Sequence, residues 1–202
     1  MQFHTYLEEI LGSKVKVKVV RTLLRHPNKS YTGRELARQI QGISHMAVFN
    51  SLKDITSFNL IKVEFHGKTQ LIRLNKRSYL YQALRSAFKY EDATLNNLLK
   101  LLKGIFSKQK EIKQAVLFGS IARGEEKLDS DIDLLIITEN KEKINRLISN
   151  NQKKITERFG NVMSVLALNK KEFKEKENSE LIKNIKKEGI WLINNENKKG
   201  KS

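Results

Sequence analysis

The sequence contains no cysteine, one proline and one tryptophan among its 202 residues. Without cysteine the chain cannot form disulfides, thiolate zinc sites, iron–sulfur clusters or a cysteine nucleophile. No apolar run approaches the roughly 20 residues that a membrane helix needs, and the N-terminus lacks the basic-then-apolar order of a signal peptide. These absences exclude disulfide-rich secreted proteins and predict a cytoplasmic protein with no membrane partner.

Acidic residues are scarce: 22 Asp and Glu stand against 39 Lys and Arg, and the formal net charge is +17. Such an excess attracts polyanions, including nucleic acid, nucleotides and acidic lipid. Residues 1–90 contain 16 basic and five acidic residues, whereas residues 91–202 contain 23 and 17. We therefore expect the nucleic-acid-binding face in the first half. The four histidines lack metal-ligand spacing, which favours surface or DNA-facing positions.

Hydrophobic periodicity predicts three helices in the first third of the chain. Apolar residues recur every three or four positions over 14–26, and further helices are expected over 32–40 and 44–58. Thr32 and Glu35 have the spacing of a capping box, in which each side chain accepts a free backbone N–H at the helix start. Two of these helices are short and joined by a tight turn, which indicates a helix-turn-helix.

After Asn59 apolar and polar residues alternate around His66-Gly67-Lys68, which predicts a basic β-hairpin. Residues 10–78 thus resemble the winged helix-turn-helix domains of bacterial and archaeal transcription regulators. The resemblance implies a helix in the major groove of double-stranded DNA and a hairpin near the phosphates. The residues that it would place at DNA are Ser44, His45, Asn50, Lys53 and Lys68. Protein binding or dimerisation is the alternative, and a homodimer is compatible with either.

The most informative segment reads AVLFGSIARGEEKLDSDIDLLIIT from Ala115 to Thr138. It begins with a short apolar strand and continues through Gly119 and Ser120 into the start of a helix near Ile121. A strand that turns into a helix offers free backbone N–H groups and a hydroxyl to an anion. The pattern predicts a phosphate cradle, with a simple capping role for Ser120 as the alternative.

Asp131 and Asp133 lie two residues apart at the start of a predicted buried strand, 132–138, so their carboxylates should share one face. Two adjacent carboxylates repel each other unless a cation or hydrogen-bond donors offset the charge. Oxygen ligands of this kind suit Mg²⁺ or Mn²⁺, with water and phosphate oxygens completing the coordination.

The segments GSIARG and SDIDLLI, with ten residues between Ser120 and Asp131, resemble the signature of the polymerase-beta-like nucleotidyltransferase superfamily and of its minimal members above all. The resemblance covers about 92–192. It implies Mg²⁺ at Asp131 and Asp133, and the triphosphate of an NTP, ATP first, at Gly119 and Ser120. It also implies transfer of a nucleoside monophosphate to an acceptor hydroxyl. Arg123 would add a phosphate contact, or alternatively occupy an ordinary surface position.

The sequence departs from this family at one position. Members usually carry a third carboxylate on a neighbouring strand, where it binds metal and accepts the proton of the acceptor hydroxyl. In the corresponding segment, NVMSVLAL, Asn161 or Ser164 stands in its place. Three explanations are open: Glu157 or Glu172 substitutes, the substrate or a partner supplies the base, or the domain binds NTP without turnover.

We predict two domains: a mainly α winged helix-turn-helix over 1–78 and, after a connecting helix over 79–91, an α+β nucleotidyltransferase domain with a mixed sheet over 92–193. A basic tail, 194–202, follows. The first functional hypothesis is a DNA-bound, Mg²⁺-dependent nucleotidyltransferase that modifies a protein or a small molecule. The second is a transcription regulator that only binds nucleotide. A third, from the family resemblance alone, is an antitoxin that modifies a partner protein.

Overall fold

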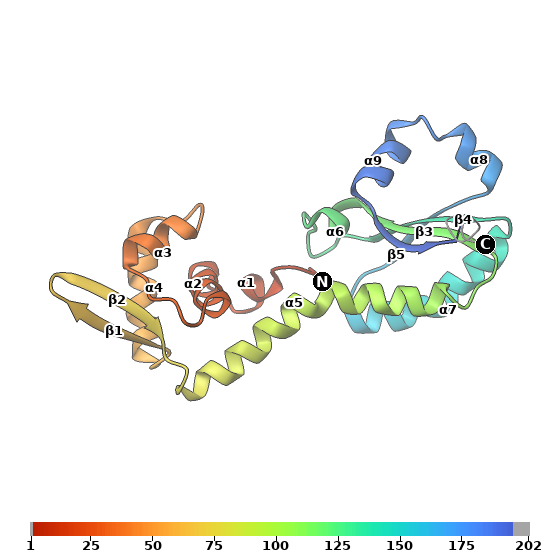
Figure 1. Cartoon of the computed structure of the whole chain (residues 1–202). Helices are drawn as coiled ribbons and strands as arrows, with labels where there is room; N and C mark the ends of the chain where they lie inside the picture. Colours follow the sequence, from red (N-terminus) through yellow and green to blue (C-terminus); the bar gives the residue numbers. More distant parts are fainter. Residues whose placement is uncertain (1, 196–202) are drawn as a thin grey trace, which may run out of the picture. The chain divides into compact units, whose positions relative to one another are not determined.

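The computed structural model describes residues 2–195, which form two compact units (Figure 1). One unit contains residues 5–93, and the other contains residues 94–195 together with residues 2–4. Helix α5 (Tyr79–Phe106) begins in the first unit and continues into the second. The last seven residues of the predicted basic tail lie outside the described part of the chain.

The first unit contains the predicted helices and hairpin. Its elements before α5 are α1 (Tyr6–Ile10), α2 (Lys14–Arg25), α3 (Gly33–Gln39), α4 (His45–Ser57), β1 (Ile61–His66) and β2 (Thr69–Leu74). Strands β1 and β2 pair antiparallel, and Tyr31 adds one antiparallel bridge to Ile72. The sequence predictions of these helices and of the hairpin are confirmed.

Side-chain caps fix where α3 and α4 begin. The Thr32 hydroxyl accepts the Glu35 N–H at 3.2 Å, and the Glu35 carboxylate accepts the Thr32 N–H at 2.7 Å, which confirms the predicted capping box. The Ser44 hydroxyl accepts the Ala47 N–H at 3.2 Å at the start of α4. Behind these caps, Val48, Leu52 and Ile55 of α4, which have the i, i+4, i+7 spacing of one helix face, lie in the core of the unit.

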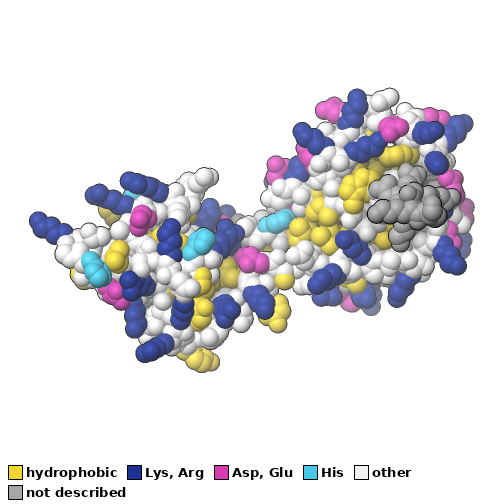
Figure 2. Space-filling view, viewed as in Figure 1, with side chains coloured by type: hydrophobic (Ala, Val, Ile, Leu, Met, Phe, Trp, Pro, Cys, Tyr) yellow, Lys and Arg dark blue, Asp and Glu magenta, His cyan; other side chains and the backbone are white. Residues whose placement is uncertain are grey.

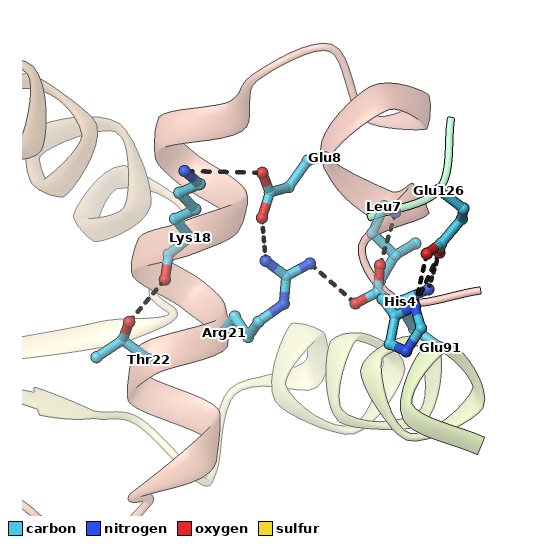
Figure 3. Close-up of polar contacts among 8 residues, drawn as sticks. All are labelled: His4, Leu7, Glu8, Lys18, Arg21, Thr22, Glu91 and Glu126. Atoms are coloured by element: carbon cyan, nitrogen blue, oxygen red, sulfur yellow. Dashed lines mark hydrogen bonds and ion pairs between the residues drawn. The ribbon is translucent and has the colours of Figure 1, made fainter. Parts of the chain in front are cut away.

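A buried ion network ties α1, α2 and α5 together (Figure 3). The Glu91 side chain has no exposed surface and accepts the Leu7 N–H at 2.7 Å. Its other oxygen accepts Nη2 of Arg21 at 2.9 Å, and Nη1 of Arg21 donates to Glu8. The Arg21 guanidinium also lies 5.4 Å from the centre of the Phe88 ring. Each charge in this network has a partner, which a buried charge requires.

The second unit is built on a mixed sheet of strand order β5-β4-β3-β6. Its elements after α5 are β3 (Ile112–Phe118), α6 (Gly119–Arg123), β4 (Ile132–Thr138), α7 (Lys141–Phe159), β5 (Met163–Leu168), α8 (Lys170–Glu175), α9 (Glu180–Glu188) and β6 (Ile190–Asn194). Strands β4 and β5 are parallel, and β3 pairs antiparallel with β4 and with β6. The predicted α+β fold with a mixed sheet is confirmed.

Helices cover both faces of this sheet (Figure 1). Helices α5 and α7 pack on one face through a core that includes Leu102 of α5, Ile144 of α7 and Leu134 of β4. Helices α8 and α9 cover the other face. Side chains alternate between the two faces along β4, so this strand contributes to both cores. Among residues 2–195, no helix combines the length and the apolar character that crossing a membrane requires.

The N-terminal residues 2–4 belong to this second unit, which the sequence did not indicate. The Phe3 side chain is buried with its ring centre 5.6 Å from that of Phe159. The buried Glu126 carboxylate accepts the N–H groups of Phe3 and His4 at 2.7 and 3.1 Å, and it contacts Nδ1 of His4 at 2.8 Å (Figure 3). Burial alone would raise the pKa of Glu126, but these hydrogen bonds outweigh it and hold the pKa below its ordinary value. His4 is therefore a hydrogen-bonding partner of Glu126 inside this unit.

Glu91→Ala should lower the free energy of unfolding of residues 5–93 by about 1–3 kcal/mol, because it leaves the buried Leu7 N–H without its acceptor and leaves Arg21 with Glu8 alone. Urea unfolding of the full chain measures this. The matched control is Asp54→Ala, which removes the exposed partner of Lys16 and should cost at most about 1 kcal/mol. Equal losses of stability in the two variants would show that the Glu91 network contributes no more than a surface ion pair.

Candidate functional site

Three strands meet at one end of the mixed sheet, where β3 ends and β4 and β5 begin. In the strand register, Asp133 of β4 pairs with Phe118 of β3 on one side and with Ser164 of β5 on the other. Gly119 follows Phe118 directly and starts α6. The topology therefore brings the Gly119 turn, Asp133 and Ser164 together at one edge.

Gly119 lets the Asp133 carboxylate lie against this turn. Its φ angle is +75°, in the left-handed region that favours glycine. A Cβ atom at this position would lie 2.2 Å from Oδ2 of Asp133, so any larger residue would displace the carboxylate. The close approach of carboxylate and turn depends on this single glycine.

The surroundings of Asp133 make its ionised form less favourable than that of an ordinary aspartate. Burial raises the pKa of Asp133, repulsion from Asp131 raises it further, and attraction to Arg123 opposes both. Asp131 is exposed and immediately precedes β4, which begins at Ile132. The predicted strand 132–138 is therefore confirmed with Asp131 one residue before it, and the two carboxylates act on each other electrostatically.

The residues present fit a divalent cation with oxygen ligands. Asp131 and Asp133 repel each other, and a cation between them would remove that repulsion. Ser164, which pairs with Asp133 in the strand register, contributes a hydroxyl at this edge of the sheet. Within residues 2–195 no cluster of three or more His, Cys, Asp or Glu residues could hold a metal. A two-carboxylate site of this kind suits Mg²⁺ when substrate phosphates and water supply the remaining ligands.

Ser164 occupies the position where a third carboxylate was expected. It is exposed, and it pairs with Asp133 across the parallel strands, where aligned side chains share a face. Asn161, the alternative from the sequence, precedes β5 and is buried. Its amide donates to the Ser130 carbonyl at 2.8 Å, so it holds the loop before β4.

Neither of the two glutamates considered as substitutes lies beside Asp133. Glu157 is on α7, which covers the opposite face of the sheet from the one that Asp133 shares with Leu135. Glu172 is on α8, beyond the far end of β5, where Lys141 contacts it at 2.5 Å. Its carboxylate also closes a capping box at the start of α8. Both glutamates therefore lie away from Asp133.

Ser120 and Arg123 both lie on the five-residue helix α6. The N-cap of α6 is Phe118, and no side chain caps it, so the alternative capping role of Ser120 is not taken. Nε of Arg123 lies 2.8 Å from Glu125, and Nη1 lies 3.8 Å from Glu188. Both partners are substantially exposed, so a phosphate could compete for this guanidinium.

A second candidate surface lies in the first unit, where Lys and Arg side chains spread over the face seen in Figure 2. A groove of about 1020 Å³ runs between α3, α4 and the hairpin. His45, Asn50, Lys53 and Lys68 line it, as expected for one shared surface. Ser44 does not line the groove, and its hydroxyl caps α4.

The groove also contains residues that were not among the predicted DNA contacts. Arg34 and Arg38 of α3 line it, and so do Met46 and Phe49 of α4. Spacing could have indicated the arginines, because positions four apart on a helix share a face. Spacing also leaves Phe49 nearer the outside of the helix, because Val48, Leu52 and Ile55 take the inward face, whereas Met46 gave no such signal.

Comparison with known proteins supports a nucleotidyltransferase domain in the second half of the chain. Residues 100–198 match the family model for "Polymerase beta, Nucleotidyltransferase", and this stretch contains the whole of the Gly119 and Asp133 site. Among curated proteins there is no match.

Among solved structures, the chain shows a distant similarity to TrmBL2, an archaeal chromatin protein whose structure "shows a novel mode of DNA binding". The sequence identity is 14%, the TM-score is 0.22, and the match covers 85% of this chain and 78% of that one. At that TM-score the similarity supports no conclusion about this chain.

Asp133→Asn should stabilise the metal-free protein at neutral pH, because it removes a partly buried charge that Asp131 repels. A carboxyl whose pKa is raised by folding opposes the folded state when it is ionised. The gain should therefore shrink as the pH falls and vanish below the ordinary Asp pKa of about 3.9. Thermal melts across pH measure it, with Asp129→Asn, an exposed carboxylate of the loop before β4, as control. A neutral or destabilising effect at pH 7 would contradict this electrostatic account.

Proposed function

We propose that the second unit binds an NTP with Mg²⁺ or Mn²⁺ at Asp131 and Asp133 and transfers its nucleoside monophosphate to a hydroxyl of a protein or small molecule. The first unit attaches this activity to double-stranded DNA. The observation that carries the proposal is the Asp133 carboxylate lying against the Gly119 turn, beside Asp131. ATP is the first nucleotide to test.

Each residue of the site has a role in this proposal. The backbone at Gly119 and the Ser120 hydroxyl would hold the triphosphate, and Arg123 would exchange its exposed glutamate partners for a phosphate. The bound cation would orient the triphosphate and neutralise charge that develops during transfer. Asp131 and Asp133 would hold it, and Gly119 leaves the space that the Asp133 carboxylate occupies.

In the reaction, the acceptor oxygen forms a bond to the α-phosphorus, and the bond between the α- and β-phosphates breaks to release pyrophosphate. The proton of the acceptor hydroxyl has to leave. Ser164, in register with Asp133, cannot accept it as a carboxylate would. Positioning and electrostatics supply most of the catalysis in phosphoryl transfer, so slow transfer is compatible with this site.

The serine at position 164 favours a second candidate function. With Ser164 in place of a carboxylate, the domain can bind NTP and metal as a signal rather than as a substrate. The protein would then be a regulator whose bound nucleotide changes its affinity for DNA. Transfer and sensing differ in one measurable property, which is whether label from the α-phosphate becomes covalently attached to an acceptor.

DNA binding is proposed for the groove between α3, α4 and the hairpin. Arg34, Arg38, Lys53 and Lys68 line this groove. Glu35 is the acidic residue of its lining, and the capping box already holds that carboxylate. A groove of this charge suits a phosphate backbone.

Ser164→Asp should raise nucleotidyl transfer about tenfold or more, because it restores a general base in register with Asp133, and general bases contribute roughly 10²–10⁴-fold. The measurement is transfer of label from each α-labelled NTP, with Mg²⁺ or Mn²⁺, into cell lysate. Ser164→Asn is the control of similar size without charge.

Asp131→Asn with Asp133→Asn should abolish both transfer and NTP binding. Transfer by the wild-type protein supports the nucleotidyltransferase function. If the wild type binds nucleotide and only Ser164→Asp transfers it, the regulator function is supported. Unchanged metal-dependent NTP binding in the double variant would show that the site is assigned wrongly.

Neutralising Lys53 or Lys68 should weaken DNA binding and reduce the slope of log K against log salt by about 0.9 for each DNA phosphate that the protein no longer neutralises. Fluorescence anisotropy over a salt series gives the slope. Lys62→Ala is the control, because Lys62 is an exposed lysine of the same hairpin that does not line the groove. Equal slopes for all three variants would move the DNA surface elsewhere.

A further inference from the structure

Two large apolar side chains project from α4 into the basic groove. Met46 is 66% exposed and Phe49 is 45% exposed, and both line the groove between α3, α4 and the hairpin. They share a helix face with Asn50 and Lys53, because positions 46, 49, 50 and 53 follow helical spacing. This outward face of α4 therefore combines apolar, amide and cationic groups.

Met46 and Phe49 are not part of the core that stabilises this unit. Val48, Leu52 and Ile55 supply the buried face of α4, and all three are almost fully enclosed. Within the described chain, Phe49 makes one notable aromatic contact, with Nζ of Lys53 at 5.1 Å from its ring centre. Apolar side chains left on the surface of a charged groove indicate a contact surface for a partner.

The charge of the groove identifies the chemistry of that partner. Its cations, Arg34, Arg38, Lys53 and Lys68, line the same groove as the apolar pair and come from α3, α4 and the hairpin. A polyanion with apolar groups between its charges would complement both features. In duplex DNA, the apolar group on the major-groove edge of the bases is the C5-methyl group of thymine.

We propose that Met46 and Phe49 contact thymine C5-methyl groups in the major groove, next to an adenine bound by Asn50, so that the protein selects sites containing A·T pairs. Asn has the geometry to hydrogen-bond N6 and N7 of adenine. The surrounding cations contact phosphates, which fixes the position of the helix without reading sequence. The inference rests on the DNA binding proposed above and adds the base class that the groove reads.

The test replaces thymine by deoxyuridine, which removes only the methyl group. A preferred duplex is first selected by the full-length protein from a random library, and each thymine of that site is then replaced in turn. Burial of one methyl group contributes roughly 0.8 kcal/mol. Wild type should therefore lose about threefold to tenfold in affinity at one or more positions.

Phe49→Ala or Met46→Ala should bind less tightly and should lose the sensitivity to deoxyuridine at the position that each residue contacts. Phe58→Ala is the matched control, because Phe58 is an exposed aromatic residue at the end of the same helix and outside the groove. This control should keep the full sensitivity of wild type. Loss of sensitivity in the groove variants alone supports the inference.

Other outcomes overturn it. If sequence-specific, salt-dependent binding persists and no deoxyuridine substitution weakens wild type, methyl readout is wrong while DNA binding stands. If Phe49→Ala and Met46→Ala keep the wild-type sensitivity at every position, other residues read the methyl groups. If the protein shows no salt-dependent DNA binding, the proposed DNA function itself fails, and a groove that binds protein becomes the explanation.

Discussion

The contact between the Asp133 carboxylate and the Gly119 turn is the constraint on which the candidate site depends. It requires β3 to end at Phe118, a left-handed glycine directly after it, and β4 in a register that places Asp133 opposite that end. Helices α8 and α9 cover the face of the sheet that contains Asp133. Glu126 anchors the loop before β4 to the N-terminal residues. A cation would offset the repulsion between Asp131 and Asp133.

Ser164 decides what this site can do. Its position beside Asp133 follows from a parallel pairing that continues in register from Ile132 to Ile137. Glu157 and Glu172 lie on other surfaces and have other partners, so the described chain does not replace the missing carboxylate from those positions. The structure thus keeps together the residues proposed to hold a nucleotide, with a serine in place of a carboxylate in register with Asp133. A substrate, a partner or slow intrinsic chemistry has to account for any turnover.

Local patterns predicted much of the fold because they depend on residues close in sequence. The capping box at Thr32, the hairpin around Gly67 and the strand from Ile132 to Thr138 all follow from short-range spacing. Contacts between distant segments could not be predicted in this way. His4 and Glu126 are more than a hundred residues apart, and no local pattern indicates that they meet. The exposure of Met46 on α4 was equally hidden, whereas the inward spacing of Val48, Leu52 and Ile55 already left Phe49 on the outer side of the helix.

The most direct test of the central claim locates the bound nucleotide on the structure. Mn²⁺ with a non-hydrolysable ATP analogue, added to isotopically labelled protein, broadens the amide NMR signals nearest the metal. Broadening should appear first at Gly119, Ser120, Asp133 and Ser164 and should saturate with the analogue. Strongest broadening at the opposite end of the sheet, near Glu139 and Lys170, or no saturable broadening at all, would contradict the assignment of this edge as a nucleotide site.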